Sequence, residues 1–278
     1  VFSVQDHFFI LLYRSIFKKI KLIIRTSGTI INDKNTYERK NLKEIRFIKN
    51  ITSYFYKYAD LLITFSKENK KFLIKKTKNK NTLLLYNHFT KKSLIHNKKR
   101  FSLNIFFIGR LVEDKDPIFF IKNLILIKNK INFRIHIVGK GFLSNEIIEY
   151  ENLYPNFIKF HSYIKDPFKK FKNKIDIFCV TSKYDGTPNV LGEAMSYGIP
   201  CLAPKYVGLS NLLLDNGKFG YIYNPLKPKT FNNKIIEIID NYHQALYKAK
   251  KGRLSMSRFD KKKFLFKLKK SIDRLNEN

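Results

Sequence analysis

Two carboxylates, Asp185 and Glu193, lie eight positions apart in a stretch that could bind a phosphorylated ligand. The surrounding sequence, TSKYDGTPNVLGEAMSYGIP, is predicted to leave a strand, to turn at Gly186 and to enter a helix at about Asn189. Asp185 then lies in the turn and Glu193 just past the first helical turn, where both can face the same ligand. A carboxylate such as Glu193 can accept two hydrogen bonds from a ribose 2′,3′-diol, which makes it a candidate nucleotide-binding residue.

The start of this predicted helix is a second candidate binding feature. Its first turn has unpaired backbone N–H groups and the positive end of the helix dipole, which together favour a diphosphate. Gly186 in the preceding turn allows the backbone to approach the ligand closely. The predicted anion-binding segment comprises Gly186, Thr187, Pro188, Asn189 and Val190.

Two cations, Arg110 and Lys115, follow an apolar run that predicts the first strand of the second half of the chain. Ligands bind at the carboxyl ends of the strands in open α/β sheets. Fixed cations at that edge stabilise negative charge that grows on phosphate oxygens as a leaving group departs. We therefore interpret Arg110 and Lys115 as phosphate-binding residues, with ordinary surface cations as the alternative in so basic a chain.

The pattern Asp114-Lys115-Asp116 formally matches a metal-binding D-x-D motif. A lysine between the acids weakens cation binding, and Asp116 followed by Pro117 instead predicts a helix start with Asp116 as its N-cap. The histidines show no metal-ligand spacing. The sequence thus predicts a site that uses no metal and no cofactor.

The composition is that of a folded basic protein. The chain has 278 residues, 44% of them hydrophobic and 15% aromatic, which is enough for two domains. Its 55 Lys and Arg against 22 Asp and Glu give a net charge of +33, which suggests a polyanionic partner. The lysines are spread from end to end, however, and abundant Asn, Ile, Phe and Tyr without any Trp indicate an AT-rich coding sequence as the main source of the charge.

Cysteine usage and hydropathy bear on the compartment. Cys179 and Cys201 are the only cysteines, which favours a reducing cytoplasm and buried thiols over a disulfide framework. Charged residues interrupt the apolar stretch that begins at Phe8, so no run reaches the ~18 residues that span a bilayer. The first residues do not resemble a signal peptide. We expect a cytoplasmic protein, with peripheral attachment of residues 8–25 to the anionic inner face of a membrane as an alternative.

Apolar runs alternate with helical patterns from residue 101 onward, which predicts an α/β fold with a doubly wound parallel sheet. The predicted strands are 104–109, 133–139, 157–161, 175–181 and 199–203, and the predicted helices are 117–130, 143–154, 167–172 and 189–197. Upstream, 21–25, 61–65 and 83–86 predict three more strands. The resulting division is a partial N-terminal Rossmann-like domain over 1–95, a C-terminal Rossmann-like domain over 100–245 and a helical tail over 246–278.

The stretch from Thr181 to Pro200 resembles the retaining nucleotide-sugar glycosyltransferases of family 4, whose pattern here is S…EG.PN…EAMA.G.P. The match extends to FIGRLVEDK at 107–115, IVGKG at 137–141 and FGYIY at 219–223. The resemblance implies the GT-B architecture, in which two Rossmann-like domains face each other across a cleft. It also implies that the N-terminal domain is truncated, because the family's first Gly-rich loop has no counterpart in this sequence.

The resemblance further implies a metal-independent reaction. A hexose or N-acetylhexosamine would move from a UDP- or GDP-sugar to a lipid-linked or surface-polysaccharide acceptor, with retention of configuration. Arg110, Lys115 and Asp185 would form the catalytic set, with Asp185 at the donor-sugar position and Glu193 at the ribose. The residues expected to bind the nucleotide sugar are Gly109, Gly186, Thr187, Pro188, Asn189, Val190, Glu193 and Gly208.

Three positions depart from the family pattern. Asp185 stands where the family usually has Glu, Ser27 where a His commonly precedes Gly28, and Asn211 where an acid is usual in the second Gly-rich loop. The expected acceptor-side loop comprises Arg25, Ser27 and Gly28. The resemblance places this loop on the acceptor side, but a serine cannot serve as general acid or base near neutral pH as an imidazole can.

Two other functions fit parts of the sequence. A non-catalytic remnant of a glycosyltransferase would retain nucleotide-sugar binding or only the fold. A basic nucleic-acid-binding protein would use the net charge, but the sequence lacks a recognisable reading helix, an RNP-like aromatic motif and a zinc module. We therefore expect no nucleic-acid partner.

Overall fold

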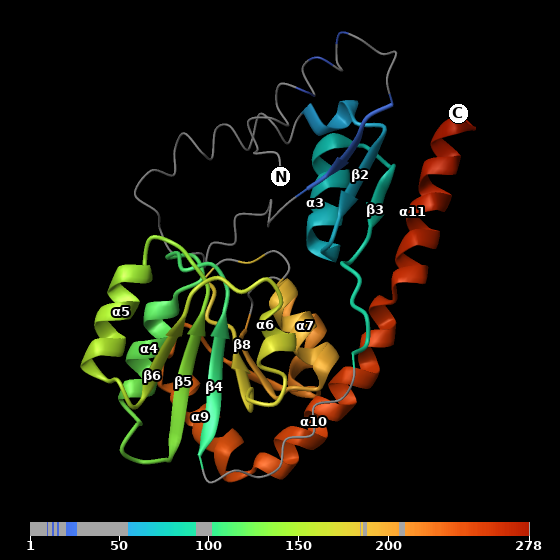
Figure 1. The fold of residues 1–278 in the computed structure, drawn as a ribbon. Coiled ribbons are helices and arrows are strands. Elements are labelled where there is room, and N and C mark those ends of the chain that lie inside the picture. Colours follow the sequence, from blue (N-terminus) through green and yellow to red (C-terminus); the bar gives the residue numbers. More distant parts are fainter. Residues whose placement is uncertain are drawn as a thin grey trace. The chain divides into compact units, whose positions relative to one another are not determined.

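The computed structural model describes residues 10, 13, 16, 21–26, 55–92, 102–183, 185, 188–205 and 209–277. Contacts divide the chain into two compact units, with residues 1–88 and 259–278 in unit 1 and residues 89–258 in unit 2. Each unit holds one parallel sheet (Figure 1). The domain boundaries expected from the sequence stay a prediction, and the contact-based grouping differs from them by placing the end of the chain with the N-terminal sheet.

Unit 1 contains three short parallel strands in the order β1-β2-β3. Helix α3 connects β2 to β3 and begins where Ser66 Oγ accepts a hydrogen bond from Asn69 N at 2.9 Å. The elements of unit 1 are β1 (Ile23–Arg25), the 3-10 helix η1 (Tyr56–Tyr58), β2 (Leu61–Thr64), α3 (Lys67–Thr77), β3 (Thr82–Leu84) and α11 (Lys261–Asn276).

Strand β2 is buried on both faces, with the adjacent helix α3 on one face and α11, from the end of the chain, on the other. Leu62 belongs to one apolar cluster with Leu73 of α3. Leu61 and Ile63 belong to another, together with Leu275 of α11. Because successive strand residues point to opposite faces of a sheet, α11 covers the face that α3 leaves open. This packing is why the last helix groups with the N-terminal sheet.

Unit 2 contains a six-stranded parallel sheet in the order β6-β5-β4-β7-β8-β9. The order runs outward in both directions from the β4/β7 pair, which is the switch point where open α/β sheets bind ligands. The strands are β4 (Leu103–Ile108), β5 (Phe133–Val138), β6 (Ile158–His161), β7 (Ile177–Cys179), β8 (Cys201–Pro204) and β9 (Tyr221–Tyr223). The helices are α4 (Pro117–Ile125), α5 (Ser144–Leu153), α6 (Pro167–Lys170), α7 (Asn189–Tyr197), α8 (Ser210–Leu213), α9 (Lys229–Asp240) and α10 (Tyr242–Ser255), with short 3-10 helices η2 (Asp215–Gly217) and η3 (Met256–Phe259).

The predicted alternation of strands and helices in unit 2 is confirmed, with α4 and α6 shorter than expected. A helix was predicted over 117–130, but α4 ends at Ile125. Beyond it, Ile127 N donates to Leu124 O at 3.2 Å and Lys130 N donates to Ile127 O at 3.0 Å. These bonds span three residues and not four, so the chain leaves the α-helix through tight turns.

A row of hydrogen-bonded polar side chains runs across strands β6, β5 and β4 of unit 2 to Asp176, which precedes β7. The ring nitrogens His161 Nε2 and His136 Nδ1 are 3.1 Å apart, and His136 Nε2 is 3.1 Å from Asn104 Oδ1. Asn104 Nδ2 donates to Asp176 Oδ2 at 3.3 Å, and the carboxylate of Asp176 is fully buried. Burial and neighbouring positive charges lower the pKa of His136 to about 4, so both the geometry and the pKa favour a neutral imidazole. Sequence analysis did not predict this row.

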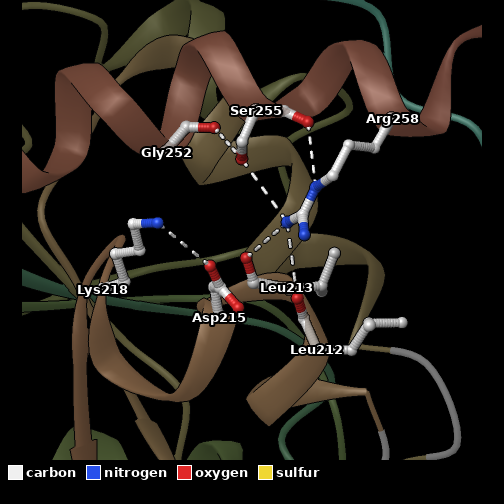
Figure 2. Close-up of polar contacts among 7 residues, drawn as sticks. All are labelled: Leu212, Leu213, Asp215, Lys218, Gly252, Ser255 and Arg258. Atoms are coloured by element: carbon white, nitrogen blue, oxygen red, sulfur yellow. Dashed lines mark hydrogen bonds and ion pairs between the residues drawn. The ribbon is translucent and has the colours of Figure 1, made fainter.

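Arg258, the last residue of unit 2, forms hydrogen bonds with carbonyl groups of two helices (Figure 2). Its guanidinium donates to Leu213 O at 3.2 Å and to Leu212 O at 3.4 Å, the last carbonyl groups of α8. It also donates to Ser255 O at 3.2 Å and lies 5.4 Å from the ring centre of Phe219. A cation at the end of a helix satisfies carbonyl groups that have no partner within the helix. Arg258 thus ties α8 to the end of α10.

Two expectations from composition can be compared with the structure. Cys179 and Cys201 are both buried and free, as predicted, and burial raises the pKa of both thiols. Among the described residues, no helix combines the length and apolar character needed to cross a bilayer.

Candidate functional site

A cavity of about 480 Å³ opens in unit 2 at the carboxyl ends of β4 and β7. It lies at the switch point of the sheet, where the sequence predicted a ligand site. Seven of the residues singled out from the sequence line it, namely Gly109, Arg110, Lys115, Asp185, Asn189, Val190 and Glu193. Residues that lie up to 84 positions apart in the chain thus reach one cavity.

The loop that follows β4 is held by the loop that follows β5. Gly109 N donates to Val138 O at 3.0 Å, and Leu111 N donates to Lys140 O at 3.0 Å. A Cβ atom on Gly139 would lie 1.9 Å from Gly109 O, and one on Gly141 would lie 2.2 Å from Leu111 O. Only glycine permits so close an approach of two backbones. The glycines of IVGKG therefore fix the loop that carries Arg110.

The same loop is also bound to the loop that follows β7. Thr181 Oγ1 donates to Lys115 O at 2.9 Å and to Asp116 O at 3.0 Å. Lys183 N donates to Asp114 O at 2.8 Å, and Lys183 Nζ is 3.1 Å from Asp116 Oδ2. Asp116 also caps α4, because its Oδ1 accepts from Phe119 N at 3.2 Å. The prediction that Asp116 is a helix N-cap is therefore confirmed.

The two cations of the β4–α4 loop have different surroundings. Lys115 Nζ forms an ion pair with Asp185 Oδ2, and 20% and 11% of their side-chain surfaces are exposed. The Arg110 side chain is exposed at the cavity, and no described residue accepts a hydrogen bond from its guanidinium. Lys140 also lines the cavity. The wall thus contains one cation that is paired with a carboxylate and two, Arg110 and Lys140, that have no carboxylate partner among the described residues.

Glu193 reaches the cavity from α7. Helix α7 begins at Asn189, as predicted, and no side chain caps its N-terminus. The Glu193 side chain is exposed to the cavity and receives no hydrogen bond from the described residues. Partial desolvation and the negative charge of Asp166 raise the pKa of Glu193, while Lys92 opposes this rise. A hydroxyl-rich ligand could supply the hydrogen bonds that this carboxylate lacks.

Some predicted site residues lie elsewhere. Pro188 is buried at the N-cap of α7. Arg25 is in unit 1, where its guanidinium donates to the side-chain oxygen of Asn87 and burial lowers its pKa. The remaining predicted residues, which lie outside the described residues, are Ser27, Gly28, Gly186, Thr187 and Gly208.

Lys140 and Tyr163 are among the cavity residues that were not singled out from the sequence. Lys140 lies between the glycines of IVGKG, and Tyr163 follows β6, with Lys140 Nζ 5.4 Å from its ring centre. The Tyr163 side chain is 62% exposed. The position of Tyr163 just beyond a strand of the predicted sheet was a usable signal, because ligands bind at the carboxyl ends of such strands.

Comparisons with known proteins show similarity to glycosyltransferases. A family described as "Glycosyl transferases group 1" matches residues 102–241. An uncharacterized glycosyltransferase of Methanocaldococcus jannaschii is 33% identical over 168 residues, which are 54% of this chain and 41% of that protein. An α-1,4-N-acetyl-D-galactosaminyltransferase of Campylobacter jejuni that acts on an undecaprenol-linked glycan is 25% identical over 178 residues, which are 62% of this chain and 47% of that protein. The chain thus spans about half the length of these two relatives.

Solved structures show similarity over nearly the whole chain. Sucrose-phosphate synthase from Thermosynechococcus elongatus has a TM-score of 0.82 at 16% identity and covers 99% of this chain and 72% of its own. HepE of Anabaena, solved with UDP-glucose, has a TM-score of 0.74 at 18% identity and covers 99% of this chain and 77% of its own. At these identities the likeness concerns the fold, and it confirms the predicted α/β fold of the GT-B class.

Proposed function

Because the chain belongs to the glycosyl transferases group 1 family, we propose that it transfers a sugar from a nucleoside diphosphate sugar to a glycan or lipid-linked acceptor. The observation that carries this proposal is the cavity at the β4/β7 switch point. The cations Arg110 and Lys115, the start of α7 and the carboxylate of Glu193 all line that cavity. This set matches the chemistry of a nucleotide with a diphosphate group.

In the proposed complex, the parts of the donor bind to different walls of the cavity. The diphosphate would lie between Arg110, Lys115 and the first turn of α7, which together supply positive charge and N–H donors. The ribose diol would donate to the carboxylate of Glu193. A UDP- or GDP-sugar is the proposed donor, and the UDP-glucose complex of the structural neighbour HepE supports this class.

The proposed transfer breaks the bond between the anomeric carbon and the diphosphate oxygen. The acceptor hydroxyl oxygen attacks that carbon from the face that the diphosphate leaves, which retains the configuration. Its proton passes to an oxygen of the departing phosphate. Arg110 and Lys115 offset the negative charge that grows on the diphosphate, so this scheme requires no metal and no covalent nucleophile.

The acceptor is proposed on other grounds. The Campylobacter relative acts on an undecaprenol-linked glycan by its name, which supports a lipid-linked or surface-polysaccharide acceptor for this chain. Such an acceptor would place the protein at the cytoplasmic face of a membrane. Helix α11 supports this location, because Leu265 and Phe266 are 49% and 68% exposed among lysines.

Nucleotide binding and sugar transfer provide the test. The purified chain is expected to bind UDP or GDP in the presence of a chelator and to transfer labelled sugar to a lipid-linked glycan acceptor. Replacing Glu193 with Ala should lower nucleotide affinity at least tenfold, because two charge-assisted hydrogen bonds are lost. Glu149→Ala, which removes an exposed acid from α5 away from the cavity, is the matched control.

The outcomes separate the candidate functions. Binding that requires a divalent cation would contradict the metal-independent scheme. Binding without transfer would identify a nucleotide-sugar-binding protein that is not an enzyme. If the wild-type chain bound neither nucleotide, the proposed function would be wrong.

A further inference from the structure

Lys115 and Asp185 are the closest pair of opposite charges in the cavity wall. The ammonium comes from the β4–α4 loop and the carboxylate from the β7–α7 loop. Both side chains are largely shielded from bulk solvent, and both line the cavity. A shielded pair of this kind interacts more strongly than an exposed one.

Other contacts already join the two loops. The backbone of Lys115 is held through Thr181 Oγ1, and Lys183 N binds Asp114 O. Lys183 Nζ adds an ion pair with Asp116. These bonds place the Lys115 main chain whether or not Asp185 is charged. The carboxylate of Asp185 therefore acts on the position and availability of the Lys115 ammonium.

The pair also sets the charge that an incoming diphosphate meets. The Asp185 carboxylate offsets the charge of the Lys115 ammonium in the empty cavity, whereas Arg110 and Lys140 line the cavity with no carboxylate partner among the described residues. A phosphate oxygen that approaches Lys115 must share or displace the carboxylate, because two anions at one ammonium repel each other. Asp185 thus competes with the diphosphate for one cation.

We propose that Asp185 is an internal counter-ion of Lys115, which holds the ammonium in the empty cavity and releases it to the diphosphate when the donor binds. This inference rests on the proposed function, and it differs from direct contact of Asp185 with the donor sugar, which the sequence resemblance implied. The competition weakens binding of the nucleoside diphosphate product. It therefore favours product release after each transfer.

The two alternative roles of Asp185 predict different effects on ligand affinity. A residue that contacts the sugar affects the affinity for the sugar nucleotide and leaves the affinity for UDP or GDP unchanged. A counter-ion of Lys115 affects every ligand that carries the diphosphate, with or without the sugar. It has no effect on the nucleoside alone, and its effect requires Lys115.

Calorimetric titration of the full chain with UDP, GDP, the matching nucleoside and inorganic pyrophosphate tests the proposal. Asp185→Asn keeps the shape and a hydrogen-bond acceptor but removes the charge. We expect this variant to bind the nucleoside diphosphate about fivefold more tightly and to bind the nucleoside as the wild type does. In a Lys115→Met background the same substitution should change the affinity less than twofold, so the two substitutions should not be additive.

Two further variants serve as controls. Glu113→Gln removes one negative charge from an exposed residue of the same loop and should leave the affinity within twofold of wild type. Asp185→Glu retains the carboxylate and should bind the diphosphate nearly as weakly as the wild type. Thermal unfolding of each variant shows whether it folds, and Asp185→Ser replaces the Asn variant if that one does not.

Several results would overturn the inference. Unchanged UDP or GDP affinity in Asp185→Asn, with loss of sugar-nucleotide affinity, would assign Asp185 to the sugar. An equal gain in the Lys115→Met background, or in Glu113→Gln, would reduce the effect to general charge. A wild-type chain that binds neither nucleotide nor pyrophosphate would refute the proposed function and this inference together, whereas the other results refute the inference alone.

Discussion

The two parallel sheets of this protein are covered in different ways. In unit 2, the central strand β4 packs against α4, the helix that immediately follows it, through Phe107 and Phe120, and α9 joins the same apolar cluster. In unit 1, β2 has α3 from its own βα unit on one face and α11 from the end of the chain on the other. Figure 1 shows both sheets with their helices.

The two sheets therefore differ in how far along the chain their covering helices lie. The helices that cover the sheet of unit 2 lie within residues 89–258, which form one continuous segment. The cover of unit 1 requires contacts between Leu61 or Ile63 and Leu275, which are more than 200 positions apart. Contacts of such large sequence separation form late and cost loop entropy. We therefore expect unit 1 to depend on the chain end and unit 2 to depend on its own tight loop contacts.

The largest expected effect comes from breaking a loop contact within unit 2. Gly139→Ala would place a Cβ atom 1.9 Å from Gly109 O, which forces two main-chain segments apart. We expect a loss of unfolding free energy of about 3 kcal/mol or more, together with loss of nucleotide binding. Thermal unfolding and titration with UDP or GDP measure the two effects.

A second glycine provides the control for backbone conformation. Gly217 also has positive φ, at +97°, but a Cβ atom there would meet nothing within 4 Å. Gly217→Ala should therefore cost only about 1 kcal/mol and leave nucleotide affinity unchanged. Equal losses for Gly139→Ala and Gly217→Ala would contradict the role of the loop contact.

The next effect concerns the face of unit 1 that α11 covers. Leu275→Ala removes buried apolar atoms from the cluster with Leu61 and Ile63, at a cost of about 2 to 3 kcal/mol. Hydrogen exchange should accelerate in β1, β2 and β3 and stay unchanged in β4 and β5. Leu265→Ala, on the exposed face of the same helix, is the control. Acceleration in both sheets would mean that the two units do not unfold independently.

A smaller effect should follow from acid. Protonation of His136 would put a proton on Nδ1, which faces His161 Nε2 at 3.1 Å, and would break the polar row. The pKa of His136 is about 4 in the folded protein, against about 6.5 in the unfolded chain. The unfolded state therefore binds more protons in this range. The contribution of neutral His136 to the free energy of unfolding is complete above pH 6.5 and is lost as the pH falls from 6.5 to 4.

Protonation of His136 should lower the free energy of unfolding by on the order of 2 kcal/mol, once partial exposure of the imidazole is allowed for. Denaturant unfolding of the full chain at pH 7, 6, 5 and 4 measures it, with hydrogen exchange to assign the loss to unit 2. His136→Gln should flatten this part of the pH profile, whereas substitution of the exposed His243 should not. A profile that His136→Gln leaves unchanged would assign the acid sensitivity to other groups.

The comparison of the two units also explains what the sequence could predict. Five of the six strands of unit 2 were recognisable as apolar runs that alternate with helical patterns, and α7 begins at the predicted Asn189. Strand β9 and helix α9 were not predicted. The cavity was predictable because the carboxyl ends of parallel strands meet at one edge. The C-terminal tail was predicted to be helical, with Phe264, Phe266 and Leu268 as docking residues. Phe264 and Leu268 pack in the cluster with Leu275, but the prediction for Phe266 is wrong, because its side chain is 68% exposed.

Other features depend on pairings that no local pattern specifies. The docking partner of α11 lies in a strand near the start of the chain, so sequence spacing could not identify it. The contact of Lys115 with Asp185 depends on loops that come from two different strands. The same is true of His136, whose partners lie on neighbouring strands. Side-chain chemistry suggested which residues could act, and only the sheet order showed which of them meet.

The smallest expected effect distinguishes the two faces of α11. Its inner face packs on unit 1, whereas Phe266 on its outer face is 68% exposed among the lysines of the helix. A basic helix with an exposed aromatic residue binds to the surface of an anionic bilayer. Phe266→Ser leaves the net charge unchanged and should weaken binding to vesicles of anionic lipid about threefold to tenfold. Sedimentation of the full chain with vesicles that contain 30% phosphatidylglycerol measures this binding. Phe142→Ser, at a position in unit 2 that is 83% exposed, should bind as the wild type does, and equal binding by all three proteins would leave net charge as the whole cause of attachment.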